Sequence, residues 1–207
     1  MEGPACGGAL LLAALGWLDD RLGSAREKGL RGHLRALFHG RVTTGVWKLA
    51  GGGAFALAAA AAARPPRDAA STVAWLADAL LVALSINTLN ALDLRPGRAL
   101  KGWLLLVGLA WLLGARSPWL PAFLAAAVGF APWDLRARAM MGDTGANALG
   151  AVAGLAWLAV PDAGARVGVL LALGLFHVWI ERRSLTAWIE EHTWARWLDR
   201  LGRPPER

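Results

Sequence analysis

The chain is dominated by long apolar stretches that contain no charged residue. They cover 3–18, 49–63, 69–92 with Asp78 as a single interruption, 102–115, 117–133, 144–161 and 167–180. Several are shorter than the roughly 18 to 20 residues that cross a bilayer unaided, so no single stretch separates a buried core helix from a transmembrane one. With 56% hydrophobic residues and a mean hydropathy of +0.41, the set favours an all-α, polytopic membrane protein.

The basic residues are distributed very unevenly over the connections between these stretches. If all seven stretches span the membrane, the connections 19–43, 93–101 and 134–143 and the segment from 181 share one side. That side holds seventeen Lys and Arg residues, against four on the other side, with Lys48 left inside a span. Basic loops remain cytoplasmic. We therefore expect about seven spans, an outer N-terminus and a cytoplasmic C-terminus.

Other classes of protein fit the sequence poorly. The net charge of +7 arises from short loops between apolar stretches and not from a separate basic domain, so we expect contact with anionic lipid and not with nucleic acid. The single cysteine, Cys6, excludes an internal disulfide, and no Cys/His cluster has the spacing of a zinc site. Residues 1–18 lack the features of a cleaved signal peptide and are interpreted as a retained span.

The chain reads as one transmembrane domain, residues 1–180, followed by a cytoplasmic tail, residues 181–207. Pro65 and Pro66 should end the Ala-rich helix before them at the outer face. Asp78 lies inside a span, where a functional role and an interfacial position both remain open. In the tail, apolar residues recur at helical spacing over 181–202, which predicts an amphipathic helix on the membrane surface.

Three polar clusters lie at the predicted cytoplasmic ends of spans. They are GWLDDRLG (16–23) with Asp19 and Asp20, INTLNALD (86–93) with Asn87, Asn90 and Asp93, and MGDTGA (141–146) with Asp143. The topology was assigned from Lys and Arg alone, yet all three clusters fall on one side. We therefore expect them to form one site.

The residue types limit the chemistry of such a site. Carboxylate and amide oxygens suit Mg²⁺, which keeps several waters and is usually shared with substrate phosphates. Neighbouring Lys and Arg side chains suit the phosphates themselves. The residues therefore indicate metal-assisted phosphate chemistry at a membrane surface.

Each cluster also has a purely structural interpretation. Asp19 and Asp20 could be a solvated helix end, and Asn87 and Asn90 could join helices by hydrogen bonds. Asp143 could cap the helix that follows it, and such a cap is compatible with binding a metal-borne phosphate at the helix N-terminus.

The three motifs together resemble those of the polyprenyl-phosphate N-acetylhexosamine-1-phosphate transferases, glycosyltransferase family 4. This family includes phospho-N-acetylmuramoyl-pentapeptide transferase of peptidoglycan synthesis and the undecaprenyl-phosphate GlcNAc-1-phosphate transferases. GWLDDRLG resembles its G-[FLW]-x-D-D motif, INTLNALD its N-x-x-N-x-x-D segment and MGDTGANALG its MGDTGSLALG. Order and spacing agree over most of residues 7–180.

The resemblance implies a Mg²⁺-dependent transfer of a sugar-1-phosphate from a UDP-sugar to polyprenyl phosphate in the lipid bilayer. In this interpretation Asp143 binds the metal together with Asp19, and Asp19 and Asp20 orient or deprotonate the lipid phosphate. Binding of substrate is assigned to Lys28, Asn87, Asn90, Asp93, Arg98 and Lys101. The sequence leaves the sugar, the polymer pathway and a possible homodimer open.

The chain departs from the family pattern in places. After Asp93 it reads DLRPGRALK, with Pro96 where the family has a second acid, and His192 is the only histidine in the region of the family's His-rich loop. One short span precedes Asp19 where family members have more, so the chain is interpreted as an N-terminally short member or a fragment. The alternative to a transferase is a catalytically silent paralogue that binds lipid phosphate or an envelope-synthesis partner. A transporter fits less well, because the polar residues gather at one membrane face.

Overall fold

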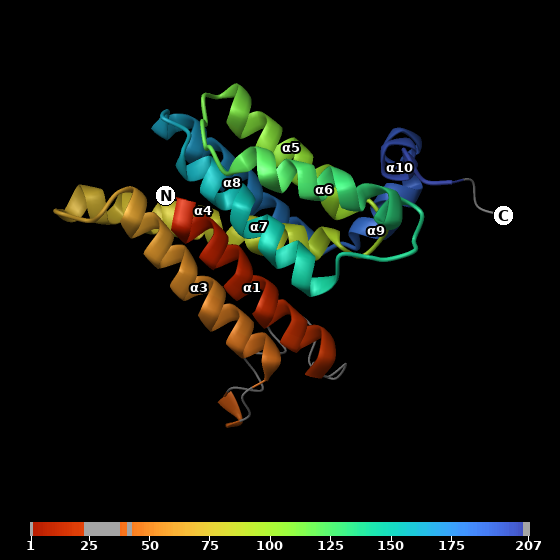
Figure 1. Ribbon diagram of the computed structural model, residues 1–207, viewed down its shortest axis with the longest axis horizontal. Helices are drawn as coiled ribbons and strands as arrows, with labels where there is room; N and C mark the ends of the chain where they lie inside the picture. Colours follow the sequence, from red (N-terminus) through yellow and green to blue (C-terminus); the bar gives the residue numbers. More distant parts are fainter. Residues whose placement is uncertain (1, 23–37, 41–42, 205–207) are drawn as a thin grey trace.

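The computed structural model describes residues 2–22, 38–40 and 43–204, so the predicted phosphate-binding Lys28 lies outside the described residues. This part of the chain is helical and holds no strand. The longer helices are α1 (Glu2–Leu22), α3 (Thr44–Ala63), α4 (Ala69–Leu92), α5 (Arg98–Leu112), α6 (Leu120–Leu135), α7 (Gly142–Leu158), α8 (Ala163–Ile180), α9 (Leu185–Glu191) and α10 (Thr193–Arg200), drawn in Figure 1.

The all-α class predicted from the sequence is confirmed. Each of the seven apolar stretches forms one helix, and α3 ends before Pro65 and Pro66 as expected. Three helices, α3, α4 and α8, are long and apolar enough to cross a membrane. Together with the shorter apolar helices, they give the bundle the composition of a membrane protein.

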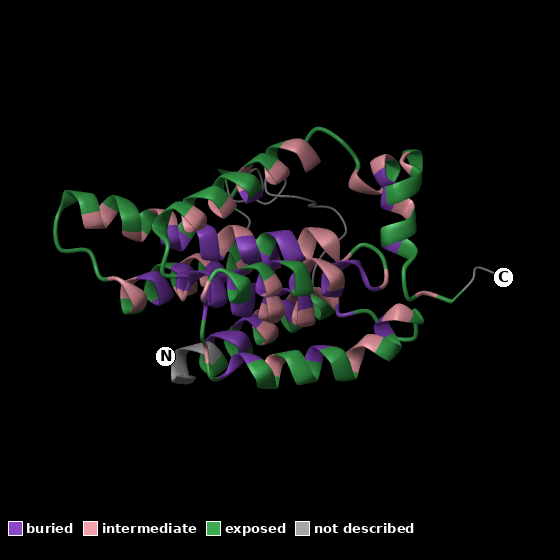
Figure 2. Cartoon of the chain, turned by 90° about the horizontal axis from the view of Figure 1, so that it is seen from above, coloured by how far each residue is buried: buried purple, intermediate pink, exposed green. Residues whose placement is uncertain are grey.

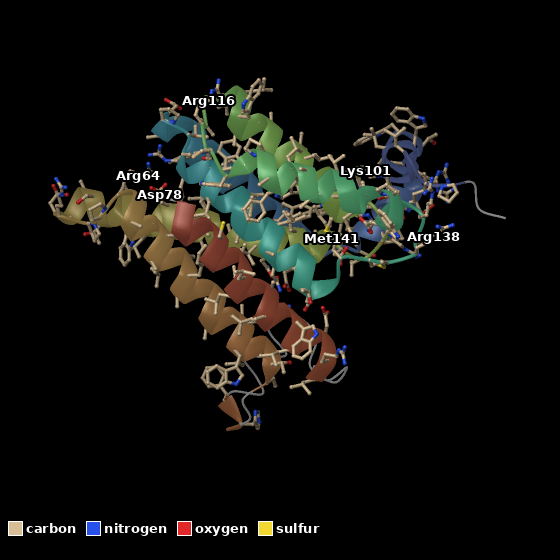
Figure 3. All side chains as sticks on the ribbon, in the orientation of Figure 1. Arg64, Asp78, Lys101, Arg116, Arg138 and Met141 are labelled. Atoms are coloured by element: carbon tan, nitrogen blue, oxygen red, sulfur yellow. The ribbon has the colours of Figure 1, made fainter. Side chains whose placement is uncertain are left out.

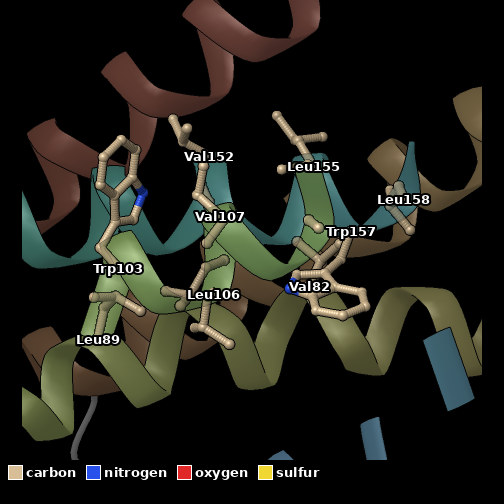
Figure 4. Close-up of a cluster of buried hydrophobic side chains, with 14 of the residues drawn as sticks. Val82, Leu89, Trp103, Leu106, Val107, Val152, Leu155, Trp157 and Leu158 are labelled. Carbon is tan, nitrogen blue, oxygen red and sulfur yellow. The ribbon is translucent and has the colours of Figure 1, made fainter. Parts of the chain in front are cut away.

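Helix α7 occupies the centre of the bundle. It contacts α1, α3, α4, α5 and α6, and most of its length from Ala146 to Leu158 is buried (Figure 2). Around it pack large apolar side chains, among them Leu89 of α4 and Trp103 and Val107 of α5 (Figure 4). The other helices expose apolar side chains over much of their outer surface, as expected where lipid and not water surrounds a bundle.

Glycines let α1 and α4 approach α7 closely. A Cβ atom on Gly150 would lie 2.5 Å from the Cα of Ile86 on α4, and a Cβ on Gly154 would lie 2.9 Å from the Cα of Val82. A Cβ on Gly16 would lie 2.3 Å from the carbonyl oxygen of Asp143. Small residues at such crossings permit the backbone contact on which helix association in lipid depends.

The two ends of the bundle differ in their polar groups. At the end opposite Asp143, the buried Asp78 carboxylate accepts hydrogen bonds from Arg64 Nε at 2.7 Å and Arg166 Nε at 3.2 Å. Both arginines also donate to carbonyl oxygens near the end of α7, those of Leu158 and Val160. Figure 3 shows Arg64 and Asp78 at this end and Met141 toward the other. Asp78 is therefore a buried ionic link between helices at this end of the bundle, and its interfacial position stays a prediction.

The tail differs from the single amphipathic helix predicted over 181–202. Two short helices, α9 and α10, meet at His192, which has extended backbone angles of φ −111° and ψ 110°. The His192 ring stacks on Trp188, 4.3 Å between ring centroids, and Trp188 also contacts Trp179 at the end of α8. This aromatic cluster joins the tail to the end of α8.

We predict that Gly16→Ala lowers the stability of the bundle by about 1–3 kcal/mol, because the added methyl group must push α1 away from α7. The matched control is Gly7→Ala on the same helix, since a Cβ at Gly7 would meet no atom within 4 Å. Thermal unfolding of both variants in detergent checks this. Equal unfolding temperatures for the two variants would contradict it.

Candidate active site

The candidate site begins with the turn that places Asp143. Gly142 has a φ of +62°, in the left-handed region that favours glycine, and a Cβ there would lie 2.9 Å from Asp20 Oδ2. The glycine therefore lets the chain turn sharply into α7 while Asp20 approaches its backbone. Asp143 then lies in the first turn of α7.

Asp20 caps α7 from a different helix. Its carboxylate accepts hydrogen bonds from the backbone N–H groups of Asp143 and Thr144, both at 3.1 Å, and from the Thr144 hydroxyl at 2.8 Å. These N–H groups have no partner within their own helix, and a carboxylate also interacts favourably with the helix dipole. The capping role considered for Asp143 therefore belongs to Asp20, which leaves the Asp143 side chain available for other contacts.

Lys48 joins the carboxylates of Asp19 and Asp143. Its ammonium nitrogen lies 3.1 Å from Asp19 Oδ2 and forms a very short ion pair with Asp143, and the Thr44 hydroxyl donates to Asp19. Thr44 and Lys48 are four residues apart at the start of α3, so they share one face of that helix. The three ionic side chains are 18% to 28% exposed and can therefore be reached from solvent.

Asn90 brings α4 into the same cluster. Its side-chain amide donates to the carboxylate of Asp143 and, more weakly at 3.4 Å, to the Asn147 side-chain oxygen. Asn147 is almost completely buried, and within the described residues its amide nitrogen has no hydrogen-bond partner. Four helices thus contribute polar groups to one point: α1, α3, α4 and α7.

Asp93, at the end of α4, lies beside this cluster. Burial, together with the negative charges of Asp134, Asp143 and Asp20, raises the pKa of Asp93 to about 7, although an interaction with the Gly142 backbone opposes the shift. One oxygen of the Asp93 carboxylate is buried and unpaired within the described part of the chain. This oxygen of Asp93 can therefore accept a proton, a hydrogen bond or a cation.

The structure distributes the remaining predicted residues differently. Asn87, one turn before Asn90, is exposed on α4. Arg98 and Lys101 contact the tail, through Asp199 and through carbonyl oxygens of α10 and its end, and not the Asp143 cluster. Their assignment to substrate binding stays a prediction, as does the role of Lys28.

Three residues near the site were missed in the sequence. Lys48 was treated as a stray charge in a span, although its spacing from Thr44 and its place at the start of an apolar stretch are a detectable signal. Asn147 reads as part of an apolar helix. Asp134 is fully buried and bonded to the Gly97 N–H at 3.1 Å, a contact between residues 37 positions apart that no local pattern reveals.

The donor set fits a hard cation only in part. Among the described residues, no group of three or more His, Cys, Asp or Glu side chains is arranged to hold a metal ion by itself. Mg²⁺, however, is usually bound by one or two carboxylates together with waters and substrate phosphates. Asp19 and Asp143 supply two such carboxylates, with the amide of Asn90 beside them and Lys48 as their present counterion.

Comparison with known proteins identifies the family of the chain. The model of the family described as glycosyl transferase family 4 matches residues 4–160, about three quarters of the chain. The chain belongs to glycosyl transferase family 4. No curated protein and no solved structure matches it.

Membership of glycosyl transferase family 4 assigns a broad activity. The family transfers sugar phosphates to polyprenyl phosphates, so its members are transferases acting on lipid-linked substrates in membranes. The apolar helices of this chain agree with a membrane location. The family resemblance expected from the three motifs is therefore confirmed.

The raised pKa of Asp93 predicts a pH dependence of stability in metal-free buffer. Unfolded aspartate titrates near ~3.9, whereas Asp93 in the fold titrates at about 7. Asp93 therefore stays protonated to a higher pH in the folded state than in the unfolded state. Its contribution to the free energy of unfolding is present in full below about pH 4 and is lost as the pH rises through about 7. Asp93→Asn removes this loss, so the variant gains in melting temperature over the wild type between pH 5 and pH 8. Parallel curves of melting temperature against pH would contradict the assignment.

Proposed function

We propose that this chain transfers a sugar-1-phosphate from a UDP-sugar to undecaprenyl or another polyprenyl phosphate at the cytoplasmic face of the bacterial inner membrane. The carrying observation is the convergence of Asp19 and Asp143, from α1 and α7, on the ammonium of Lys48. Ionic groups from distant segments rarely meet at an accessible point of a membrane bundle without a functional reason. The product then serves cell-envelope polysaccharide or peptidoglycan synthesis.

The proposed topology has seven spans, with the N-terminus outside and the C-terminus inside. Its support is that Asp19, Asn90 and Asp143 meet at the end of the bundle that carries the strongly basic connections. The Asp78 end carries only four basic residues in its connections. Donor nucleotides are cytoplasmic, so a site on the basic side has access to them.

In the proposed reaction, an oxygen of the lipid phosphate attacks the β-phosphorus of the UDP-sugar. A new P–O bond forms, the bond between the β-phosphorus and the bridging oxygen breaks, and UMP leaves with that oxygen. Asp19 orients the lipid phosphate as a carboxylate. Lys48 exchanges a carboxylate for a phosphate oxygen and so holds one of the two anions in place.

Two further groups keep the site rigid. Asp20 fixes the first turn of α7 through the backbone of Asp143 and Thr144, and Asn90 orients the Asp143 carboxylate. Mg²⁺ held by Asp143 and Asp19 would neutralise charge on the phosphates and on the leaving UMP. Preorganised contacts of this kind supply most of the catalysis in phosphoryl transfer.

We predict that purified protein releases UMP from a UDP-sugar in the presence of Mg²⁺ and undecaprenyl phosphate. Asp143→Asn should lower the rate at least about 100-fold, because it removes a charge from the centre of the site. Asp162→Asn is the matched control: it makes the same change at the N-cap of α8, where asparagine caps equally well. Absence of UMP release with all common UDP-sugars would overturn the proposal.

We also predict that Lys48 competes with the metal. Lys48→Gln leaves Asp19 and Asp143 without their counterion, so Mg²⁺ alone should raise the melting temperature of this variant more than that of the wild type. In the Asp143→Asn variant, Mg²⁺ should raise the melting temperature less than it does in the wild type. A Mg²⁺-induced shift that is identical in wild type and Lys48→Gln would argue against a metal between these two carboxylates.

The second candidate function is a catalytically silent family member that binds lipid phosphate or an envelope-synthesis partner. Two observations favour it: Pro96 stands where the family motif has an acid, and Arg98 is engaged by Asp199 in the tail. A silent member binds a UDP-sugar or undecaprenyl phosphate without release of UMP. The UMP assay combined with equilibrium binding therefore separates the two functions.

A further inference from the structure

A buried ion pair outside the site joins the start of α5 to the tail. Arg98 Nε and Nη2 donate to the two oxygens of Asp199, at 2.7 and 3.1 Å, and Nη1 donates to the Thr186 hydroxyl at 3.1 Å. The side chains of Arg98 and Asp199 are each only 6% exposed. A bidentate pair of this kind fixes orientation as well as distance.

Two more cations complete the junction. Lys101 donates to the carbonyl oxygens of Leu198 at 2.9 Å and of Leu201 at 3.3 Å at the C-terminal end of α10, where a cation interacts favourably with the helix dipole. Arg203 donates to the Pro96 carbonyl at 2.7 Å and to Asp199 at 3.1 Å. Figure 3 shows Lys101 toward this side of the bundle. Through Pro96, Arg203 contacts the loop of residues 93–97, which connects α4 to α5.

The loop in question, residues 93–97, connects Asp93 to α5. Its end next to α5 is held twice: Arg203 donates to the Pro96 carbonyl, and the buried Asp134 accepts the Gly97 N–H at 3.1 Å. Asp134 is close enough to Asp93 for their charges to interact. Every one of these contacts acts within five residues of Asp93, whereas Asp93 itself has one oxygen without a partner in the described chain.

The tail is anchored independently of the loop. Trp188 on α9 contacts Trp179 on α8 edge to face, with ring centroids 5.6 Å apart, and Trp194 on α10 contacts Trp188 at the same distance. The tail is thus attached to α8 by aromatic packing and to α5 by ions. Because the tail contacts both α8 and α5, a movement of α8 can shift the 93–97 loop beside α5.

We propose that helices α9 and α10 brace the 93–97 loop, and that Asp199 is a positioning residue that holds Asp93 in the active site. The proposal rests on the proposed transferase function and extends it to a segment outside residues 4–160, the part that the family model matches. It also explains why the loop can do without a second acid at Pro96: the backbone of Pro96 and Gly97 is held from outside by Arg203 and Asp134.

The test compares Asp199→Asn with Glu190→Gln in the full-length protein. Asp199→Asn keeps the shape of the side chain but removes the carboxylate that pairs with the buried Arg98 and with Arg203. Glu190→Gln is the matched control, because it breaks a 3.6 Å ion pair with Arg200 on the same tail whose side chains are about half exposed. Asp199→Glu serves as the conservative variant that keeps the carboxylate.

Two measurements are made on each variant. Hydrogen exchange should speed up roughly tenfold or more at the Gly97 amide in Asp199→Asn and not in α7, because the loop opens without loss of the core. Mg²⁺-dependent UMP release should show a higher KM for UDP-GlcNAc and a fall in kcat/KM of about 10- to 100-fold, as expected for a displaced binding group. Glu190→Gln should match the wild type, and Asp199→Glu should recover part of the loss.

The outcomes separate the inference from the proposed function. Unchanged exchange in the loop overturns the brace, and so does faster exchange with wild-type KM and kcat. Loss of protection throughout α7 also overturns it, since Asp199 would then support the whole fold. Failure of the proposed function is seen separately, as absence of UMP release from the wild type; the loop exchange and equilibrium binding of UDP-GlcNAc then decide whether Asp199 positions a binding loop.

Discussion

The ammonium of Lys48 between the carboxylates of Asp19 and Asp143 sets the geometry of one end of the bundle. Two carboxylates brought together without a cation repel each other, and inside a bundle the low dielectric strengthens that repulsion. With Lys48 in place, the ends of α1, α3 and α7 can converge. Gly16 makes the convergence possible in steric terms, because its missing side chain leaves room for the backbone at Asp143.

The two ends of the molecule show how ionic groups differ in structural and in functional settings. At the Asp78 end, two arginines surround one carboxylate, and their remaining N–H groups bond to carbonyls near the end of α7, so the described charges there are satisfied. At the Asp143 end, Lys48 pairs with Asp19 and Asp143, and Asp93 stands nearby with one unpaired oxygen in the described chain. The carboxylate at the first end is fully paired, whereas at the second end the described residues leave a carboxylate oxygen without a partner.

Much of this architecture could be predicted from the sequence, because the strongest signals are local. Apolar stretches interrupted by charge or proline define the helices, and the distribution of Lys and Arg assigns three polar motifs to one side. The structure does bring Asp19, Asn90 and Asp143 together. What the sequence could not give are contacts between distant residues: the lysine that neutralises two acids, the capping of α7 by Asp20, and the attachment of Arg98 to the tail.

The position of Pro96 illustrates the limit of a motif as a guide to a site. In the sequence, the loop after Asp93 lacks an acid that the family pattern contains. In the structure, a buried carboxylate is still present near Asp93, because Asp134 at the end of α6 accepts the Gly97 N–H. Asp134 is fully buried, so it acts on Asp93 through its charge and on the loop through its hydrogen bond, and not by touching a substrate. A missing residue in a motif is therefore not a missing charge beside Asp93, and under the proposed function activity depends on whether Asp93 keeps its position.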